Sequence, residues 1–211
     1  MPSVKPNLGN SFSQIYFWLL FAASFTCCGA ADVQIKIPPS GVYWDGAAKI
    51  GNDGKTLTGL IDTFIGDSSG GVCQFYFDGK IAGKKFEVNC GNFVDTGTVV
   101  GTVTILNDST IFLKTKEGPG CSERVADFVQ DGATFILKNK LPLIQIRSIK
   151  SEKAFFYSKP DSSTKRKAYL VHGNEAQVTE SQDGWLKVTF KKTSGWMREK
   201  DMIQLHSKNG N

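Results

Sequence analysis

Apolar and polar residues alternate along most of the chain from Ile35 to Leu137, in short runs separated by turns. A period of two buries one side of an extended strand and exposes the other. The pattern predicts strands over Thr56–Ile65, Val72–Phe77, Lys85–Val88, Thr98–Ile105 and Thr110–Lys114. Turn-forming residues are found at 52–54, 67–71, 78–79, 95–97 and 107–108. Their regular spacing indicates an antiparallel β-barrel or sandwich.

One short helix interrupts this series of predicted strands. It is expected over Ser122–Gln130, because Ser122 can cap its first turn. Val125, Phe128 and Val129 recur at helical spacing and share one face. We expect this helix to cover one end of the sheet.

A second pattern of short strands follows a segment that mixes charge with proline. That segment, 138–142, is the predicted boundary. We therefore predict a mainly β protein, with an N-terminal barrel or sandwich over 31–140 and a smaller β domain over 145–205. Residues 206–211 are polar and are expected to form a disordered tail.

The first thirty residues have the pattern of a secretory signal peptide. Lys5 precedes an uninterrupted apolar segment, Ile15–Phe25, and the small residues Gly29-Ala30-Ala31 follow it. Eleven residues at about 1.5 Å each are too short for a hydrocarbon core of roughly 30 Å. We predict a periplasmic or secreted protein, with a retained membrane anchor or lipid attachment at Cys27 or Cys28 as alternatives. Export argues against nucleic acid as a partner.

The positive charge of the chain is concentrated near its C-terminus. Residues 31–148 carry 12 Lys and Arg against 13 Asp and Glu, whereas residues 149–205 carry 11 against 7. The basic excess favours anionic partners such as peptidoglycan carboxylates, a membrane surface or an acidic protein face. A merely solubilising surface is the alternative.

Three cysteines lie beyond the predicted signal peptide, so one disulfide is expected in an oxidising compartment. Cys73 and Cys90 flank a predicted hairpin, Gln74–Asn89, that turns at Asp78-Gly79. Cys121, in a tight glycine-containing loop, can equally reach back and close a barrel. The three possible pairings stay open at this point.

Glycines and aromatic residues near the C-terminus form a specific signature. It consists of Tyr157–Pro160, in the pattern Tyr-x-x-Pro, followed by the pairs Gly184-Trp185 and Gly195-Trp196. With these elements the segment 149–205 resembles a bacterial SH3 (SH3b) domain. In such a small barrel Trp185 and Val188 are expected in the core, and Gly195 is expected to permit a bend that admits Trp196.

The resemblance implies a domain that binds peptides, often the stem peptides of peptidoglycan. Aromatic rings offer stacking area and cations can pair with carboxylates. The candidate ligand-binding residues are Phe156, Tyr157, Tyr169, Lys165, Arg166, Lys167 and Lys187. In the alternative interpretation, most of these aromatic residues are core and the basic run is a solvated loop.

The N-terminal region is similar to the small periplasmic β-barrel inhibitors of lysozyme. The similarity lies in a Gly41-Val-Tyr43 start, Leu-Thr-Gly turns, a cysteine beside an aromatic strand and a late Gly-Cys pair. It implies a protein that blocks a cell-wall-degrading enzyme.

Catalytic signatures are weak throughout. Beyond the predicted signal peptide the histidines are His172 and His206, too few for a zinc amidase, and the segment with the three cysteines has none. Gly118–Arg124 is similar to the nucleophile segment of L,D-transpeptidases, but Pro119 stands where that motif has histidine. The turns 52–54 and 67–70 lack calcium-ligand spacing. We expect no metal and no cofactor.

These observations favour a non-enzymatic binding protein of the bacterial envelope. Its partner would be a peptidoglycan stem peptide or another protein. The alternative is a periplasmic immunity protein or inhibitor of a cell-wall hydrolase or secreted toxin. A third hypothesis is an enzyme of unknown type in the N-terminal domain.

Overall fold

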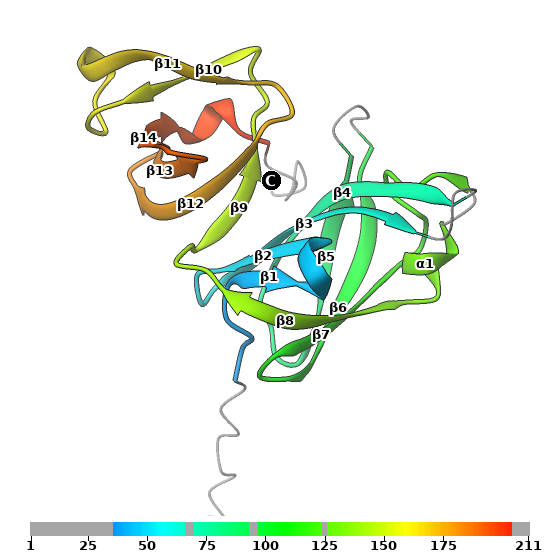
Figure 1. The fold of residues 1–211 in the computed structure, drawn as a ribbon. Helices are drawn as coiled ribbons and strands as arrows, with labels where there is room; N and C mark the ends of the chain where they lie inside the picture. Colours follow the sequence, from blue (N-terminus) through cyan, green and yellow to red (C-terminus); the bar gives the residue numbers. More distant parts are fainter. Residues whose placement is uncertain (1–35, 66–69, 93–96, 124–125, 204–211) are drawn as a thin grey trace, which may run out of the picture. The chain divides into compact units, whose positions relative to one another are not determined.

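The computed structural model describes residues 36–65, 70–92, 97–123 and 126–203 (Figure 1). The predicted signal peptide, the tail at 206–211 and His206 lie outside these residues. Within the described ranges, no helix has the length and apolar character needed to cross a membrane.

The first eight strands form a closed antiparallel barrel in which each strand pairs with the next and β1 pairs with β8 (Figure 1). Their bounds are β1 Gly41–Tyr43, β2 Ala48–Asn52, β3 Thr56–Ile65, β4 Gly71–Lys80, β5 Lys85–Gly91, β6 Val99–Asn107, β7 Thr110–Thr115 and β8 Ala133–Lys140. The predicted barrel is confirmed, and the five strands expected from the alternation correspond to β3 through β7.

Large apolar side chains from every strand of the barrel occupy its interior, as the alternating pattern requires. Among those that are fully buried are Tyr43, Ile50, Leu57, Phe75, Phe77, Ile111, Leu113 and Phe135. On β3, Gly59 leaves space for the ring of Phe77, because a Cβ at this position would lie within 3 Å of several of its atoms.

The prediction of a hairpin turn at Asp78-Gly79 is wrong. Both residues lie inside β4, where Asp78 is opposite Thr58 on one side and Asn89 on the other. The chain reverses after Lys80 instead, so Cys90 faces Phe77 rather than Cys73. An Asp-Gly pair marks a turn only where the strand pairing ends. Here the pairing of β4 with its neighbours continues through Asp78 and Gly79.

Cys73 and Cys121 form the disulfide, and Cys90 is a buried free thiol. The loop that contains Cys121 runs beside the start of β4. Gln74 N–H donates to the Gly120 carbonyl (2.8 Å) and Ser122 N–H donates to the Val72 carbonyl (2.9 Å). The loop thus covers the part of β4 that extends beyond its pairing with β5.

The predicted helix is present but short. The helix α1 spans Asp127–Gln130, and its N-cap is Ala126, so Ser122 does not cap it. Phe128 stacks on Trp44 at a centroid distance of 5.0 Å. Val129 is fully buried in the barrel core. The helix therefore packs on the barrel through aromatic contacts with Trp44, a residue of the short 3-10 helix η1, Trp44–Gly46.

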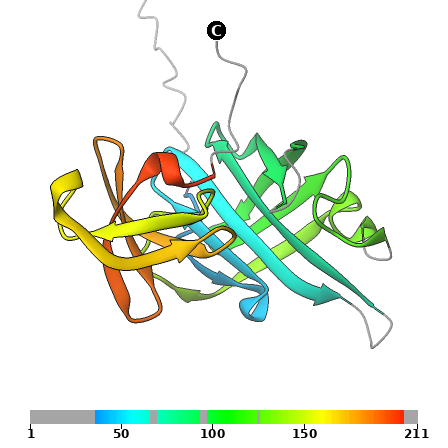
Figure 2. The same cartoon turned by 90° about the horizontal axis from the view of Figure 1, so that it is seen from above.

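The last six strands form a second sheet in the order β11-β10-β14-β13-β12-β9. Most of this sheet is drawn in yellow to red in Figure 2. Their bounds are β9 Gln145–Ser148, β10 Lys153–Tyr157, β11 Lys165–Val171, β12 Glu175–Gln182, β13 Trp185–Phe190 and β14 Thr193–Arg198. Ile149, Phe156, Leu186, Val188 and Met197 are among the residues of its separate core. This sheet begins just after the predicted boundary at 138–142.

Strand β9 also packs on the outside of the barrel. Four residues of β3 and β4 face outward from the barrel but are at most 5% exposed: Thr58, Leu60, Tyr76 and Asp78. At Gly51 of β2, a Cβ would lie 2.4 Å from the Cα of Gln145, so glycine is needed for this close approach. The described residues from 36 to 203 belong to one compact unit, and the division into two domains stays a prediction.

Candidate functional site

The outer face of the β10–β11 hairpin carries two aromatic rings. Phe155 of β10 is directly opposite Tyr169 of β11, and their ring centroids are 5.5 Å apart. Tyr169 is 44% exposed, whereas its neighbour Leu170 turns into the core. Cross-strand aromatic pairs of this kind stabilise a hairpin, and here the pair also offers ring surface to solvent.

Lysines lie over both rings. The Lys165 Nζ atom is 3.6 Å from the centroid of Phe155, and the Lys153 Nζ atom is 5.3 Å from that of Tyr169. Each cation–π contact contributes roughly 0.5–1 kcal/mol at an exposed site. The ammonium groups keep further donors for an incoming acceptor. We call Lys153, Phe155, Lys165, Lys167 and Tyr169 the cationic face; Lys167 is exposed on β11 between the other two residues of that strand.

The structure brings only some of the predicted ligand-binding residues together. Lys165, Lys167 and Tyr169 belong to the cationic face. Phe156 is 1% exposed in the core of the second sheet, so its ring is not available to a ligand and that assignment is corrected.

The other predicted residues do not belong to the cationic face, although Tyr157 lies on β10 and Arg166 on β11. Tyr157 is 5% exposed. Arg166 donates through Nη1 to the Ser194 carbonyl (2.7 Å). Lys187 lies on β13, where its Nζ pairs with Glu180 Oε1 at 2.6 Å.

Sequence reasoning missed Phe155 and Lys153. The signal for them is the phase of the alternation, since Ala154 and Phe156 are buried and the residues between and before them must face outward. Two adjacent phenylalanines in a strand with one wet face cannot both be core.

A second aromatic cluster surrounds Tyr157. Trp185 makes an edge contact with Tyr157 at 4.8 Å, and the Arg198 guanidinium lies 5.4 Å from the Tyr157 centroid. Arg198 Nη2 also donates to Ser162 Oγ (2.9 Å). Trp185 was expected in the core, but it is only partly buried, because Leu186 and Val188 are the inward residues of β13. Trp196 pairs with Tyr157 across β10 and β14.

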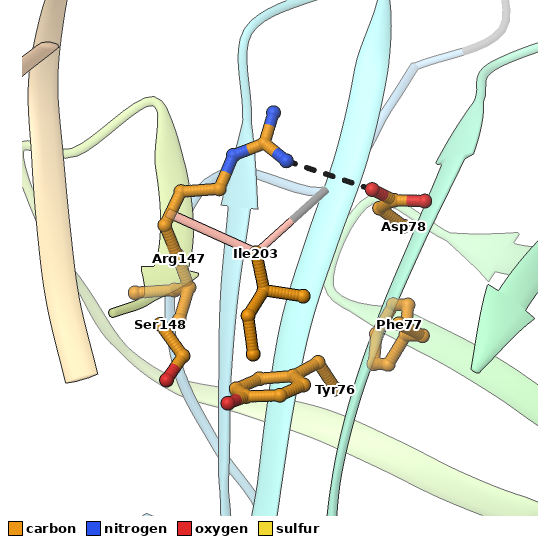
Figure 3. Close-up of a pocket in the computed structure, with 7 residues that line it drawn as sticks. Tyr76, Phe77, Asp78, Arg147, Ser148 and Ile203 are labelled. Atoms are coloured by element: carbon orange, nitrogen blue, oxygen red, sulfur yellow. Dashed lines mark ion pairs between the residues drawn. The ribbon is translucent and has the colours of Figure 1, made fainter. Parts of the chain in front are cut away.

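A small pocket lies between β4 and the chain around β9 (Figure 3). The Arg147 Nη1 atom is 3.5 Å from Asp78 Oδ2, and both side chains are almost fully buried. Ile203 and Tyr76 line the same pocket, and Ile203 lies between Arg147 and Tyr76 in the close-up. The close pairing of these side chains indicates a structural contact between the barrel and β9.

The ion pair continues into a chain of hydrogen bonds. Arg147 Nε donates to Gln145 Oε1 (3.0 Å), and Gln145 Nε2 donates to Asp53 Oδ2 (2.9 Å). Burial raises the pKa of Asp53, but the hydrogen bonds from Gln145 and from the Lys55 and Thr56 backbone outweigh it, and the pKa falls below its usual range. This chain of polar contacts therefore ends at a carboxylate on each side, Asp78 at one end and Asp53 at the other.

The candidate catalytic features have other structural roles. Cys121 is bonded to Cys73, so its sulfur is no thiol nucleophile. His172 Nδ1 lies 2.9 Å from the Lys150 carbonyl. Asp53 Oδ1 accepts from the Lys55 and Thr56 N–H groups, as in an ordinary turn. In the part of the chain that is described, no group of three or more His, Cys, Asp or Glu side chains could hold a metal ion.

Comparison with protein families identifies the second sheet. Residues 150–202 match the bacterial SH3 domain, which confirms the resemblance drawn from the tyrosine, glycine and tryptophan pattern. The chain thus carries a bacterial SH3 domain near its C-terminus, and the cationic face belongs to it. No curated protein and no solved structure matches the chain. The similarity of the barrel to lysozyme inhibitors stays a prediction.

Proposed function

We propose that this protein is a non-enzymatic binding protein of the bacterial envelope, whose SH3 domain binds the carboxylate-bearing peptides of peptidoglycan. Bacterial SH3 domains are binding modules, often for peptidoglycan, and this one is matched over residues 150–202. The observation that carries the proposal is the cationic face, where Lys153 lies over the exposed ring of Tyr169 and Lys165 lies over the half-buried ring of Phe155.

The chemistry of the cationic face suits such a ligand. Stem peptides present carboxylates at intervals along a short chain, and ammonium groups attract them with charge-assisted hydrogen bonds. The flat rings of Phe155 and Tyr169 supply apolar contact between the cations. Among the described residues, no carboxylate forms an ion pair with Lys153, Lys165 or Lys167. Their charge is therefore available for a ligand.

Export is supported by the disulfide. Cys73–Cys121 is the kind of bond that persists in oxidising compartments outside the cytoplasm. The apolar segment at 15–25 adds to this argument from the sequence. Periplasmic or secreted placement fits a ligand found in the cell wall.

Co-sedimentation with purified sacculi tests the proposal. Lys165→Gln and Lys153→Gln are each expected to weaken binding about threefold to fivefold, the scale of one exposed charge contact. Lys187→Gln is the matched control, because it removes the same charge from a lysine that already pairs with Glu180. Wild-type protein that stays in the supernatant, or an equal loss in all three variants, would contradict the proposal. Turnover of muropeptides would contradict its non-enzymatic part.

A second candidate function, an inhibitor or immunity protein, is favoured by one feature of the barrel. Phe64 and Val72 are cross-strand partners on β3 and β4, and they are 54% and 49% exposed. Exposed apolar pairs of this kind contribute to protein–protein contacts. In this case the protein would not co-sediment with sacculi but would form a tight complex with a cell-wall hydrolase. Phe64→Ser would weaken that complex, whereas Lys165→Gln would leave it unchanged.

A further inference from the structure

Strand β11 is an open edge of the second sheet. It is the last strand in the sheet order, whereas β9, at the other end, packs against β2 and β3 (Figure 1). Among the described residues, only β10 pairs with β11. Six of its seven residues are exposed, Leu170 being the buried one. Edge strands present unpaired backbone groups and can accept another strand.

The hydrogen bonds at the end of β11 show which backbone groups point outward. Val171 N–H donates to Asn174 Oδ1 (3.1 Å), and Asn174 N–H donates to the Val171 carbonyl (3.0 Å). Val171 therefore directs both groups away from β10. The side to which backbone N–H and carbonyl groups point alternates from one residue to the next along an antiparallel strand. Tyr169 is two residues before Val171, so its N–H and carbonyl also point away from β10.

The side chains along this edge fall into a basic half and an apolar half. Lys165, Arg166 and Lys167 occupy the first half, and no acidic residue lies on the strand. Tyr169 and Val171, 44% and 43% exposed, occupy the second half. Such an edge repels another basic strand and attracts a partner that is acidic at one end and apolar at the other.

We propose that the open edge of β11 binds an extended acidic segment of a protein partner as an added β-strand. In an antiparallel arrangement, an apolar residue of the partner meets Tyr169 and acidic residues meet the lysines. The backbone of Tyr169 would anchor the added strand. Lysines on edge strands also prevent association between copies of one chain, and the same charge selects an acidic partner. This proposal goes beyond peptidoglycan binding, which uses side chains of the cationic face and requires no strand pairing.

A synthetic peptide, acetyl-Thr-Val-Thr-Val-Thr-Glu-Thr-Glu-Thr-amide, serves as the probe with the full-length protein. Two N-methylated versions block alternate backbone N–H groups. Strand addition predicts that one version loses binding at least tenfold while the other binds nearly as the parent does, because only alternate N–H groups face the edge. Equal binding of both versions, or no binding of the parent, would overturn the proposal.

Amide hydrogen exchange supplies a second readout. Binding is expected to slow hydrogen exchange at the Tyr169 amide by at least tenfold. The exchange rate of the Leu170 amide should not change, because that N–H points toward β10. Unchanged exchange at Tyr169 in the presence of bound peptide would also overturn the proposal. Neither result affects the co-sedimentation assay with sacculi. A failure of strand addition at β11 can therefore be distinguished from a failure of peptidoglycan binding.

Discussion

The guanidinium of Arg147 lies 3.5 Å from the carboxylate of Asp78, and both side chains are almost completely removed from solvent. Asp78 belongs to the barrel and Arg147 to the first strand of the second sheet. The ion pair therefore joins the two sheets. It lies beside an apolar contact of Leu60, Tyr76, Leu143 and Ile146.

Removing one member of this pair leaves the other buried without its counter-charge. Asp78→Ala is expected to lower the free energy of unfolding by about 3–5 kcal/mol. The double variant Asp78→Leu with Arg147→Met is expected to lose much less, because neither charge remains. Chemical denaturation measures both. Lys187→Ala breaks an exposed pair and should cost at most about 1 kcal/mol. A double variant as unstable as the single one would contradict this account.

Gly51 permits the approach of β9 to the barrel. Gly51→Ala places a Cβ against the backbone of Gln145, so β9 must move outward. The Ile146 amide, which donates to Thr58 Oγ1 (2.8 Å), should then exchange its hydrogen faster. Gly54→Ala is the control, because nothing lies within 4 Å of its Cβ position and only its positive φ opposes the change. Equal exchange of Ile146 in both variants would show that the close approach is unimportant.

The disulfide closes a loop across a sequence separation of 48 residues. Replacing Cys73 and Cys121 together by serine is expected to lower the free energy of unfolding by up to about 4 kcal/mol, the loop-closure entropy for this length. The loop at Gly120 should also lose protection, since its carbonyl accepts from Gln74 N–H. Denaturation with and without reductant measures the effect. Wild-type protein that is equally stable when reduced would contradict the prediction.

Cys90 couples stability to alkaline pH. Burial, with a smaller effect of the Asp78 charge, raises the pKa of its thiol to about 12. The unfolded thiol ionises near pH 8.5, so this contribution is fully present below that pH and decreases as pH rises toward 12. Between pH 9 and 10 the free energy of unfolding should decrease by up to about 1.4 kcal/mol per pH unit. Cys90→Ala should lack this slope.

The same burial predicts low reactivity of the Cys90 thiol. A thiol reagent at pH 8 should modify Cys90 only in denatured protein, because the thiolate is the nucleophile and is disfavoured in the folded chain. Peptide mapping by mass spectrometry identifies the modified residue. Rapid modification of Cys90 in the folded protein would contradict both predictions for this residue.

The sequence alone determined the local elements and the identity of the SH3 domain. Alternation placed β3 correctly at Thr56–Ile65, because period-two burial is a property of a strand and its immediate neighbours. The Gly-Trp pairs marked the SH3 domain, which the family comparison confirms. The lysines of β11 were found as candidates because local charge is visible in the sequence.

The tertiary structure decided what the outward side of each strand meets. Asp78 has the sequence context of a turn, and only the pairing of β4 with β3 and β5 shows that it is a buried strand residue. Phe155 and Phe156 are alike in sequence, and the register with Tyr169 and the core decides which one reaches solvent. The disulfide partner of Cys121 is decided by the position of its loop, which runs beside the start of β4. The burial of Asp78 and the pairing of Cys73 with Cys121 depend on contacts between residues distant in the chain, which no local pattern encodes.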